Sequence, residues 1–275
     1  MIDTLVLSAG GLNCLLILGC LKGLFELKEM NEDFKNIKNI ISVSASSVII
    51  LPFLLGFSYN AIMKIFLSCN FNLLNQDEFS LNQLLSNYGF YSNDFIDKII
   101  DTFLKNSNHT ENLTLKELYE ISNINHIVKV INITKQEALY INHESHPDLD
   151  IKTLIKMTTC VPFLFKPIKY KDELYIDGGT NGCFPIDYIK QLKTKKYFGI
   201  NIILEMIEIN TILDYIKMVV SIPNHSDRIR NKKKILTVIC NNGGILETIN
   251  ENNQDFKLEL INLGYTKIKD HFIHN

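Results

Sequence analysis

The chain has 275 residues, of which 46% are hydrophobic and 21% are charged. These fractions are typical of a globular protein with a substantial apolar core. The formal net charge of −2 provides no general basic face for phosphate backbones, so nucleic acid is not an expected partner. The one basic cluster, residues 228–234, is expected to be a solvated loop or helix end. A weak contact with anionic lipid head groups is the alternative for that cluster.

The cysteines and the N-terminal residues indicate in which cellular compartment the protein is expected. The six cysteines form no C-x-x-C pair and no zinc-type spacing, so free thiols and a reducing environment are expected. Asp3 stands where a signal peptide would be basic, and no small-residue cleavage site follows. The longest charge-free apolar runs, 12–21 and 48–57, are too short to span a bilayer. We therefore expect a cytoplasmic protein, peripheral to membranes if it contacts them.

The first half of the chain alternates apolar runs with helical patterns. Residues 4–8 predict a buried strand, and Ala9-Gly10-Gly11 predicts a tight turn before a helix at 12–28. A second strand is predicted at 37–43, and it leads into an apolar helix at 46–55. Amphipathic patterns then predict helices at 60–67, 92–104 and 114–121.

The second half continues the alternation. Strands are predicted at 128–134, 137–142, 198–204 and 236–240, and a hairpin at 168–170 and 174–176. Helices are predicted at 151–158, 186–192, 209–220, 254–263 and 267–272, and an irregular passage lies between Pro162 and Pro167. This order predicts an α/β sandwich with a mainly parallel central sheet. No linker or repeat is visible, so we expect a single domain over 1–275, with its motifs at about 3–205 and C-terminal strand and helices at 206–275.

Residues 40–47 (IISVSASS) predict the position of a reactive serine. The apolar run stops at the pentapeptide Ser42-Val43-Ser44-Ala45-Ser46 and continues into a helical pattern, which is the layout of a nucleophile elbow. Such a serine needs a base and donors for an oxyanion. The flanking residues must be small, and a serine Cβ is expected to cost more there than glycine. By itself, a serine among small residues is more often structural.

Asp177 is the candidate base. It ends a predicted strand and precedes Gly178 and Gly179, although Asp-Gly-Gly by itself is most often a surface turn. A histidine base remains an alternative. The histidines considered, which lie in or near predicted loops and are otherwise surface residues, are His126, His143 and His146.

Gly10 and Gly11 are the candidate oxyanion donors. Backbone amides in a glycine turn at a helix N-terminus form a site for anions. A nucleotide-binding turn is the alternative, but neither G-x-G-x-x-G nor a phosphate-loop lysine is present.

Together these segments resemble the patatin-like phospholipase family. The resemblance rests on the loop at 8–14, the elbow at 42–46 and Asp177-Gly178-Gly179, which Phe184-Pro185 follow. Residues 54–58 and 161–167 also resemble the family, and the similarity covers about 3–205. It implies a three-layer α/β/α fold and hydrolysis of acyl esters in phospholipids or other lipids, without metal or cofactor.

The resemblance also implies roles for residues. Ser44 would attack the acyl carbonyl, and Asp177 would accept its proton directly. The amides of Gly10, Gly11 and Leu12 would stabilise the oxyanion. Water would then hydrolyse the acyl-enzyme.

Several positions depart from the family pattern. These are Ala9 and Cys14 for glycines, Asn13 for a basic residue, Ser42 and Ser46 for the elbow glycines, and Gly182 and Cys183 for asparagines. Two hypotheses follow. The first is an active lipid acyl hydrolase, and the second is a catalytically weak or inactive protein that keeps the fold and has a lipid-binding or regulatory role. Retention of both Ser44 and Asp177 favours the first. A nucleotide-binding α/β protein is a weaker third.

Overall fold

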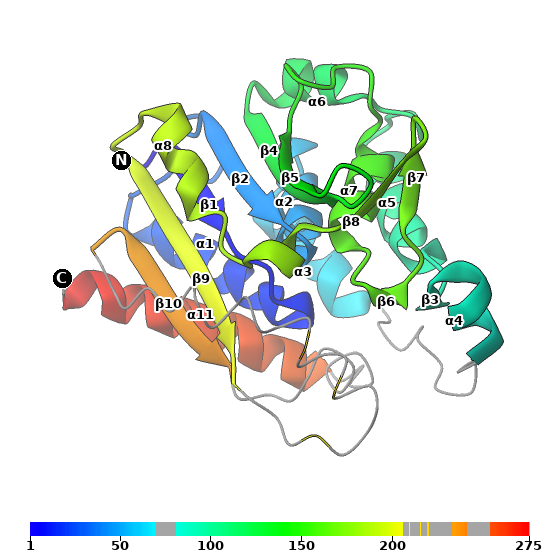
Figure 1. Ribbon diagram of the computed structural model, residues 1–275. Helices are drawn as coiled ribbons and strands as arrows, with labels where there is room; N and C mark the ends of the chain where they lie inside the picture. Colours follow the sequence, from blue (N-terminus) through cyan, green and yellow to red (C-terminus); the bar gives the residue numbers. More distant parts are fainter. Residues whose placement is uncertain are drawn as a thin grey trace.

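A central sheet with helices on both sides forms the fold (Figure 1). The computed structural model describes residues 1–69, 81–205, 233–240 and 254–274, with isolated positions at 209, 215 and 219. Within these residues eight strands join in one sheet, in the order β10-β9-β1-β2-β4-β8-β7, with β5 also paired to β4. The predicted three-layer α/β/α sandwich with a mainly parallel sheet is confirmed.

The parallel part of the sheet is its buried centre. Its strands are β1 (Thr4–Leu7), β2 (Asn39–Val43), β4 (Asn125–Asn132), β9 (Tyr197–Leu204) and β10 (Ile235–Cys240). They are mostly apolar because helices or loops cover both of their faces. The antiparallel strands lie beside β4 and are β5 (Glu137–Ile141), β7 (Ile168–Tyr170) and β8 (Glu173–Asp177).

Most helices pack on one face of the sheet and form the main core. They are α1 (Leu16–Glu26), α2 (Ala45–Leu54), α3 (Tyr59–Ser68), α5 (Asp94–Asn106), α6 (Leu115–Ser122), α7 (Ile151–Thr159) and α11 (Gln254–Ile273). The segment after β8 covers the other face, with two 3-10 turns (Gly178–Asn181 and Ile186–Tyr188) and α8 (Ile189–Leu192). There Phe184 and Ile189 pack on Val6, Ile41 and Ile127 of the sheet.

Several boundaries differ from the prediction. The helix expected at 12–28 begins as a 3-10 turn (Gly11–Leu15) and ends at Glu26, because Lys28 has a positive φ of 58°. The strand expected at 128–134 begins at Asn125, because His126 buries its ring through a hydrogen bond to Ser42. The two helices expected after residue 254 are one helix, α11. The helix predicted at 209–220 lies outside the described residues, apart from the isolated positions.

A second, small sheet was not predicted. It pairs β3 (Gly89–Tyr91) with β6 (Phe163–Phe165), and α4 (Leu81–Asn87) precedes it. The prolines at 162 and 167 made the passage between them look irregular, yet three residues are enough to form this strand. The small sheet has a core of its own around Phe90, Leu164 and Phe165.

Glycines allow α1 and α11 to pack backbone against backbone. A Cβ on Gly19 would overlap the carbonyl of Ile261, and a Cβ on Gly264 would overlap the carbonyl of Leu16. The thiol of Cys20 donates to the carbonyl of Gly264 across the same contact, at 3.3 Å. In Figure 1, α11 passes behind β9 and β10 and lies against α1. The last helix is therefore fixed directly to the helix that follows β1.

We expect Gly264→Ala to destabilise the protein by about 1–3 kcal/mol, because the new methyl group forces the two helices apart. In an ordinary helix interior the same change stabilises by about 1 kcal/mol, so the sign is diagnostic. Urea unfolding would measure the difference. Asn262→Ala, at an exposed position of the same helix, is the control and should change stability little. Equal or greater stability of Gly264→Ala would contradict the close packing.

Candidate active site

The strand β4 brings Ser44 and Asp177 together. On one side Val43 of β2 pairs with Lys129, and Ser44 follows Val43. On the other side Asp177, the last residue of β8, pairs with Val130. The two side chains therefore meet over adjacent positions of one strand, and Ser44 Oγ donates a hydrogen bond to Asp177 Oδ2 at 2.5 Å.

Ser44 occupies a sharp turn between β2 and α2. Its φ of 57° and ψ of −137° lie in a region that residues other than glycine rarely adopt, at a cost of about 1–3 kcal/mol. Neighbouring groups hold this conformation. The amide of Ser44 donates to Thr158 Oγ1 at 2.8 Å, and the Thr158 hydroxyl donates to the carbonyl of Lys129 at 2.7 Å. Thr158 carries no motif of its own, so sequence reasoning missed it.

The serines that flank the elbow are accommodated without backbone strain. Ser42 and Ser46 both have negative φ, so the turn does not need glycine's conformational freedom there. Ser46 Oγ donates to the carbonyl of Val43 at 2.8 Å and accepts from its amide at 3.1 Å. Ser42 Oγ lies 2.8 Å from both Ser47 Oγ and His126 Nε2. A serine at position 42 or 46 was expected to cost more than glycine in this turn. The backbone conformation of Ser42 and Ser46 adds no such cost.

The histidines considered as alternative bases have other surroundings. His126 lies within β4 rather than in a loop, and burial lowers its pKa to about 3. It is therefore neutral at physiological pH and is bonded to Ser42. The ring of His143 stacks on Tyr119 with centroids 3.7 Å apart. Nδ1 of His146 bonds the hydroxyl of Ser145 at 3.0 Å.

Asp177 is a buried carboxylate with two hydrogen-bond donors. Its Oδ1 accepts from the amide of Gly179 at 2.7 Å, and its Oδ2 accepts from Ser44. Burial raises the pKa of Asp177 from 3.8 to about 6. The hydrogen bonds from Ser44 and Gly179 and the positive charge of Lys129 limit that rise. Asp177 is therefore mostly ionised at pH 7 and still a stronger base than an exposed aspartate.

The glycines after Asp177 allow a close backbone approach. A Cβ on Gly178 would overlap the carbonyl of Lys129, so the turn packs directly on β4. A Cβ on Gly179 would lie 3.1 Å from both Asp177 Oδ1 and Cys183 Sγ. The Asp-Gly-Gly sequence is thus part of the packed interior here rather than a surface turn.

The segment that contains Gly10, Gly11 and Leu12 follows Ala9, which lies next to the turn after Asp177: a Cβ on Gly179 would be 3.5 Å from the Cβ of Ala9. Gly11 has a φ of 54° and begins the 3-10 turn that leads into α1. The first amides of a helix have no acceptor within it, so they are suited to bind an anion. The segment contacts both motifs, since the amide of Ala9 donates to the carbonyl of Cys183, and Ser46 Oγ lies 3.3 Å from the carbonyl oxygen of Leu7.

Two residues near this turn that depart from the family pattern, Asn13 and Cys14, are buried. Asn13 and Cys14 are 1% and 0% exposed, and Cys14 Sγ lies 3.7 Å from the carbonyl of Ser8. Burial raises the pKa of the Cys14 thiol, so it is un-ionised. None of the six cysteines forms a disulfide bond in the described residues.

Neither a metal cluster nor a membrane-spanning helix was found in the described ranges. No group of three or more His, Cys, Asp or Glu side chains there could hold a metal ion. None of the helices there combines the length and apolarity needed to cross a bilayer.

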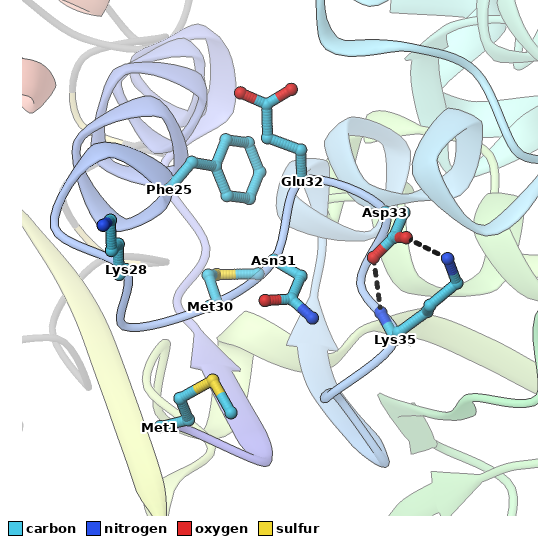
Figure 2. Close-up of a pocket in the computed structure, with 8 residues that line it drawn as sticks. All are labelled: Met1, Phe25, Lys28, Met30, Asn31, Glu32, Asp33 and Lys35. Carbon is cyan, nitrogen blue, oxygen red and sulfur yellow. Dashed lines mark hydrogen bonds and ion pairs between the residues drawn. The ribbon is translucent and has the colours of Figure 1, made fainter.

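A surface cavity lies at the opposite end of the parallel strands from Ser44 (Figure 2). It measures about 660 Å³ and is lined by Met1, Phe25, Lys28, Met30, Asn31, Glu32, Asp33 and Lys35. Its residues precede β1 and β2, whereas Ser44 follows β2. The exposed ion pair between Lys35 and Asp33 is at one side of the cavity. This cavity is therefore separate from Ser44 and Asp177.

The strained backbone at Ser44 predicts a difference in stability between two variants. Ser44→Ala and Ser44→Gly both lose the hydroxyl group, but only glycine adopts the φ of Ser44 without a steric cost. We expect Ser44→Gly to be more stable than Ser44→Ala by about 1–2 kcal/mol. Chemical denaturation of the two variants side by side would measure this difference. If Ser44→Ala were the more stable variant, the turn would not be strained.

Comparison with solved structures agrees with this fold. The structure matches the crystal structure of VipD from Legionella pneumophila with a TM-score of 0.63 and 15% identity, over 99% of this chain and 67% of that one. At this identity the likeness shows the fold alone.

Two curated viral proteins are similar in sequence. "Probable lipid hydrolase 463L" of Invertebrate iridescent virus 6 is 30% identical over 194 residues, which are 70% of this chain and 65% of the relative. "Uncharacterized protein R571" of Acanthamoeba polyphaga mimivirus is 28% identical over 67% of this chain and 60% of that protein. The chain thus spans less than two thirds of either relative. A family model for patatin-like phospholipase matches residues 5–189, and the chain belongs to that family.

Proposed function

We propose that this chain hydrolyses acyl esters of lipids, with Ser44 as nucleophile and Asp177 as general base. The observation that carries the proposal is the 2.5 Å hydrogen bond between Ser44 Oγ and Asp177 Oδ2, on a serine held in a strained strand-to-helix turn. Family membership and the printed name of the iridescent virus relative support a lipid as the substrate.

The proposed reaction has two halves. In the first, Asp177 accepts the proton of Ser44 while Oγ attacks the acyl carbonyl carbon, and the carbonyl electrons move onto oxygen. When those electrons return, the ester C–O bond breaks, and Asp177 gives its proton to the departing alcohol. In the second half a water molecule gives a proton to Asp177 while its oxygen attacks the carbonyl carbon of the acyl-enzyme. The bond between that carbon and Ser44 Oγ then breaks, the acyl group leaves as a carboxylic acid, and Asp177 returns the proton to Ser44.

The oxyanion formed in each half needs donors that are already in place. We assign this role to the backbone amides of Gly10, Gly11 and Leu12, at the start of the 3-10 turn. The hydrogen bond from Ala9 to Cys183 and the contact of Ser46 Oγ with the carbonyl of Leu7 support this assignment, because they place the segment against both motifs. Fixed amides stabilise developing charge without reorganising during the reaction.

Peripheral membrane contact is proposed for a patch next to the small sheet. Leu85, Tyr88 and Phe163 are 69%, 66% and 47% exposed, and the pairing of Gly89 with Phe163 brings the last two near each other. Phe163 lies five residues after Thr158, whose hydroxyl accepts from the amide of Ser44. Aromatic side chains at this place would bring a lipid surface close to the proposed nucleophile.

Lipid binding without turnover is the second candidate. It is favoured by the residues at the proposed oxyanion turn, where Asn13 and Cys14 are buried and Asn13 Oδ1 has no hydrogen-bond partner. Such a change near the donors could slow the chemical step while leaving the fold intact. The variants below separate the two candidates.

We expect Ser44→Ala and Asp177→Asn each to lower hydrolysis of a p-nitrophenyl ester and of a fluorogenic phospholipid by at least about 10³-fold, because each removes one member of the pair. Ser44→Ala should also abolish labelling by a fluorophosphonate probe. Ser68→Ala, which changes an exposed serine of α3, is the matched control and should be as active as the wild type. A wild type that neither turns over substrate nor reacts with the probe would leave only the binding function.

The raised pKa of Asp177 predicts the pH dependence. The base must be ionised to accept a proton, so kcat/KM should rise with pH through about 6 and reach a plateau above 7. Initial rates between pH 4.5 and 8.5 would test this. His126, with a pKa of about 3, stays neutral over that range and adds no limb. An acid limb near pH 4 would show that Asp177 is not the base or is not buried during turnover.

A further inference from the structure

Lys129 is a buried lysine in the centre of the sheet. Its side chain belongs to β4 and is among the buried charged groups, at 5% exposure. Its Nζ donates hydrogen bonds to the backbone carbonyls of Asn181 and Gly182, the second at 2.8 Å. These carbonyls end the short turn that begins at Gly178, directly after Asp177. The ammonium group therefore holds the segment that carries the carboxylate.

The backbone of the same residue holds the serine. The carbonyl of Lys129 accepts the hydroxyl of Thr158, which in turn accepts the amide of Ser44. That carbonyl is also the group that Gly178 approaches too closely for any Cβ. Lys129 thus contacts the turn after Asp177 through both its side chain and its backbone, and reaches Ser44 through one threonine.

A lysine at this position has an energetic cost. An ammonium group loses its hydration on burial, and an aliphatic side chain would fit a central strand without that loss. Ile127, two residues earlier on the same face of β4, is such a side chain. The cost is offset here by charge-assisted hydrogen bonds to two carbonyls.

The charge of Lys129 acts on a carboxylate that has few other ionic neighbours. The groups that face Asp177 are the Ser44 hydroxyl, the Gly179 amide and the thiols of Cys14 and Cys160, whose pKa values burial raises. The thiols are therefore neutral. The positive charge of Lys129 favours ionised Asp177 against the burial that disfavours it.

We propose that Lys129 is a positioning residue for the Ser44–Asp177 pair, with its ammonium group fixing the 178–182 turn so that the carboxylate stays within hydrogen-bond reach of the serine. The inference rests on the proposed function and assigns a role to a residue that no motif includes. It implies that Lys129 acts on the chemical step and on the ionisation of the base, in addition to stability.

The test compares Lys129→Met with the wild type and with Lys129→Arg. Methionine keeps the unbranched stem and removes the charge, whereas arginine restores a cation and donors. We expect Lys129→Met to lower kcat per fluorophosphonate-titrated site by about tenfold or more, with KM little changed, because misplaced catalytic groups slow the chemical step. The acid limb of kcat/KM should move to higher pH, and Lys129→Arg should recover part of both effects.

The chain offers a matched control in Lys257. This lysine of α11 is also buried, and its Nζ donates to the carbonyls of Leu67 and Cys69 at 3.2 and 2.5 Å, which ties α11 to the end of α3. Lys257→Met therefore removes a similar buried ammonium group from another place. It should lower thermal stability but leave the titrated kcat and the acid limb as in the wild type. Equal kcat and equal acid limbs in both methionine variants would overturn the proposal.

Hydrogen–deuterium exchange separates this inference from the proposed function, because it needs no turnover. Lys129→Met should speed amide exchange at residues 178–183 by at least about tenfold, while Lys257→Met should not. An inactive wild type with this exchange pattern would reject the proposed hydrolase and keep the positioning role. An active wild type with unchanged exchange in Lys129→Met would keep the proposed hydrolase and reject the positioning role.

Discussion

The pairing of β4 with β2 and with β8 is the constraint on which the site depends. Because β2 runs parallel to β4 and β8 runs antiparallel, the end of β2 and the end of β8 reach adjacent positions of the same strand. A shift of either strand by one residue would turn its side chains to the opposite face of the sheet. The short bond between Ser44 and Asp177 is thus a consequence of strand register. The buried interior on both faces of β4 is what fixes that register.

Burial gives Asp177 its chemical character. A carboxylate in water would be too weakly basic to take a proton from a serine hydroxyl efficiently, and one buried without donors would stay protonated. Here the surroundings raise its pKa to about 6, between these limits. The groups responsible belong to the elbow, the turn after β8 and β4. The pKa of Asp177 is therefore set by the packing of three segments that are distant in sequence.

Local patterns predicted most of the fold, and they singled out Ser44 and Asp177, whose side chains are hydrogen-bonded in the structure. The elbow and the Asp-Gly-Gly turn carry recognisable small residues, and the parallel strands are apolar runs of strand length. The contribution of Thr158 could not be predicted, because its partners Ser44 and Lys129 belong to other segments. Lys129 interrupts an otherwise apolar strand, and no sequence motif includes it. The short strand β6 was not predicted, because the prolines on either side of it are typical of irregular structure.

The contact between α1 and α11 has a consequence for the extent of the functional unit. The family match ends at residue 189, yet α11 begins at Gln254 and rests on the helix that continues from the proposed oxyanion segment. We therefore propose that the C-terminal part shares one domain with the motifs. A recombinant fragment trimmed to the matched span would expose the glycine-lined side of α1 to water. The choice of boundary would then decide whether Gly10 and Gly11 keep the packing that supports them, and with it the shape of the proposed anion site.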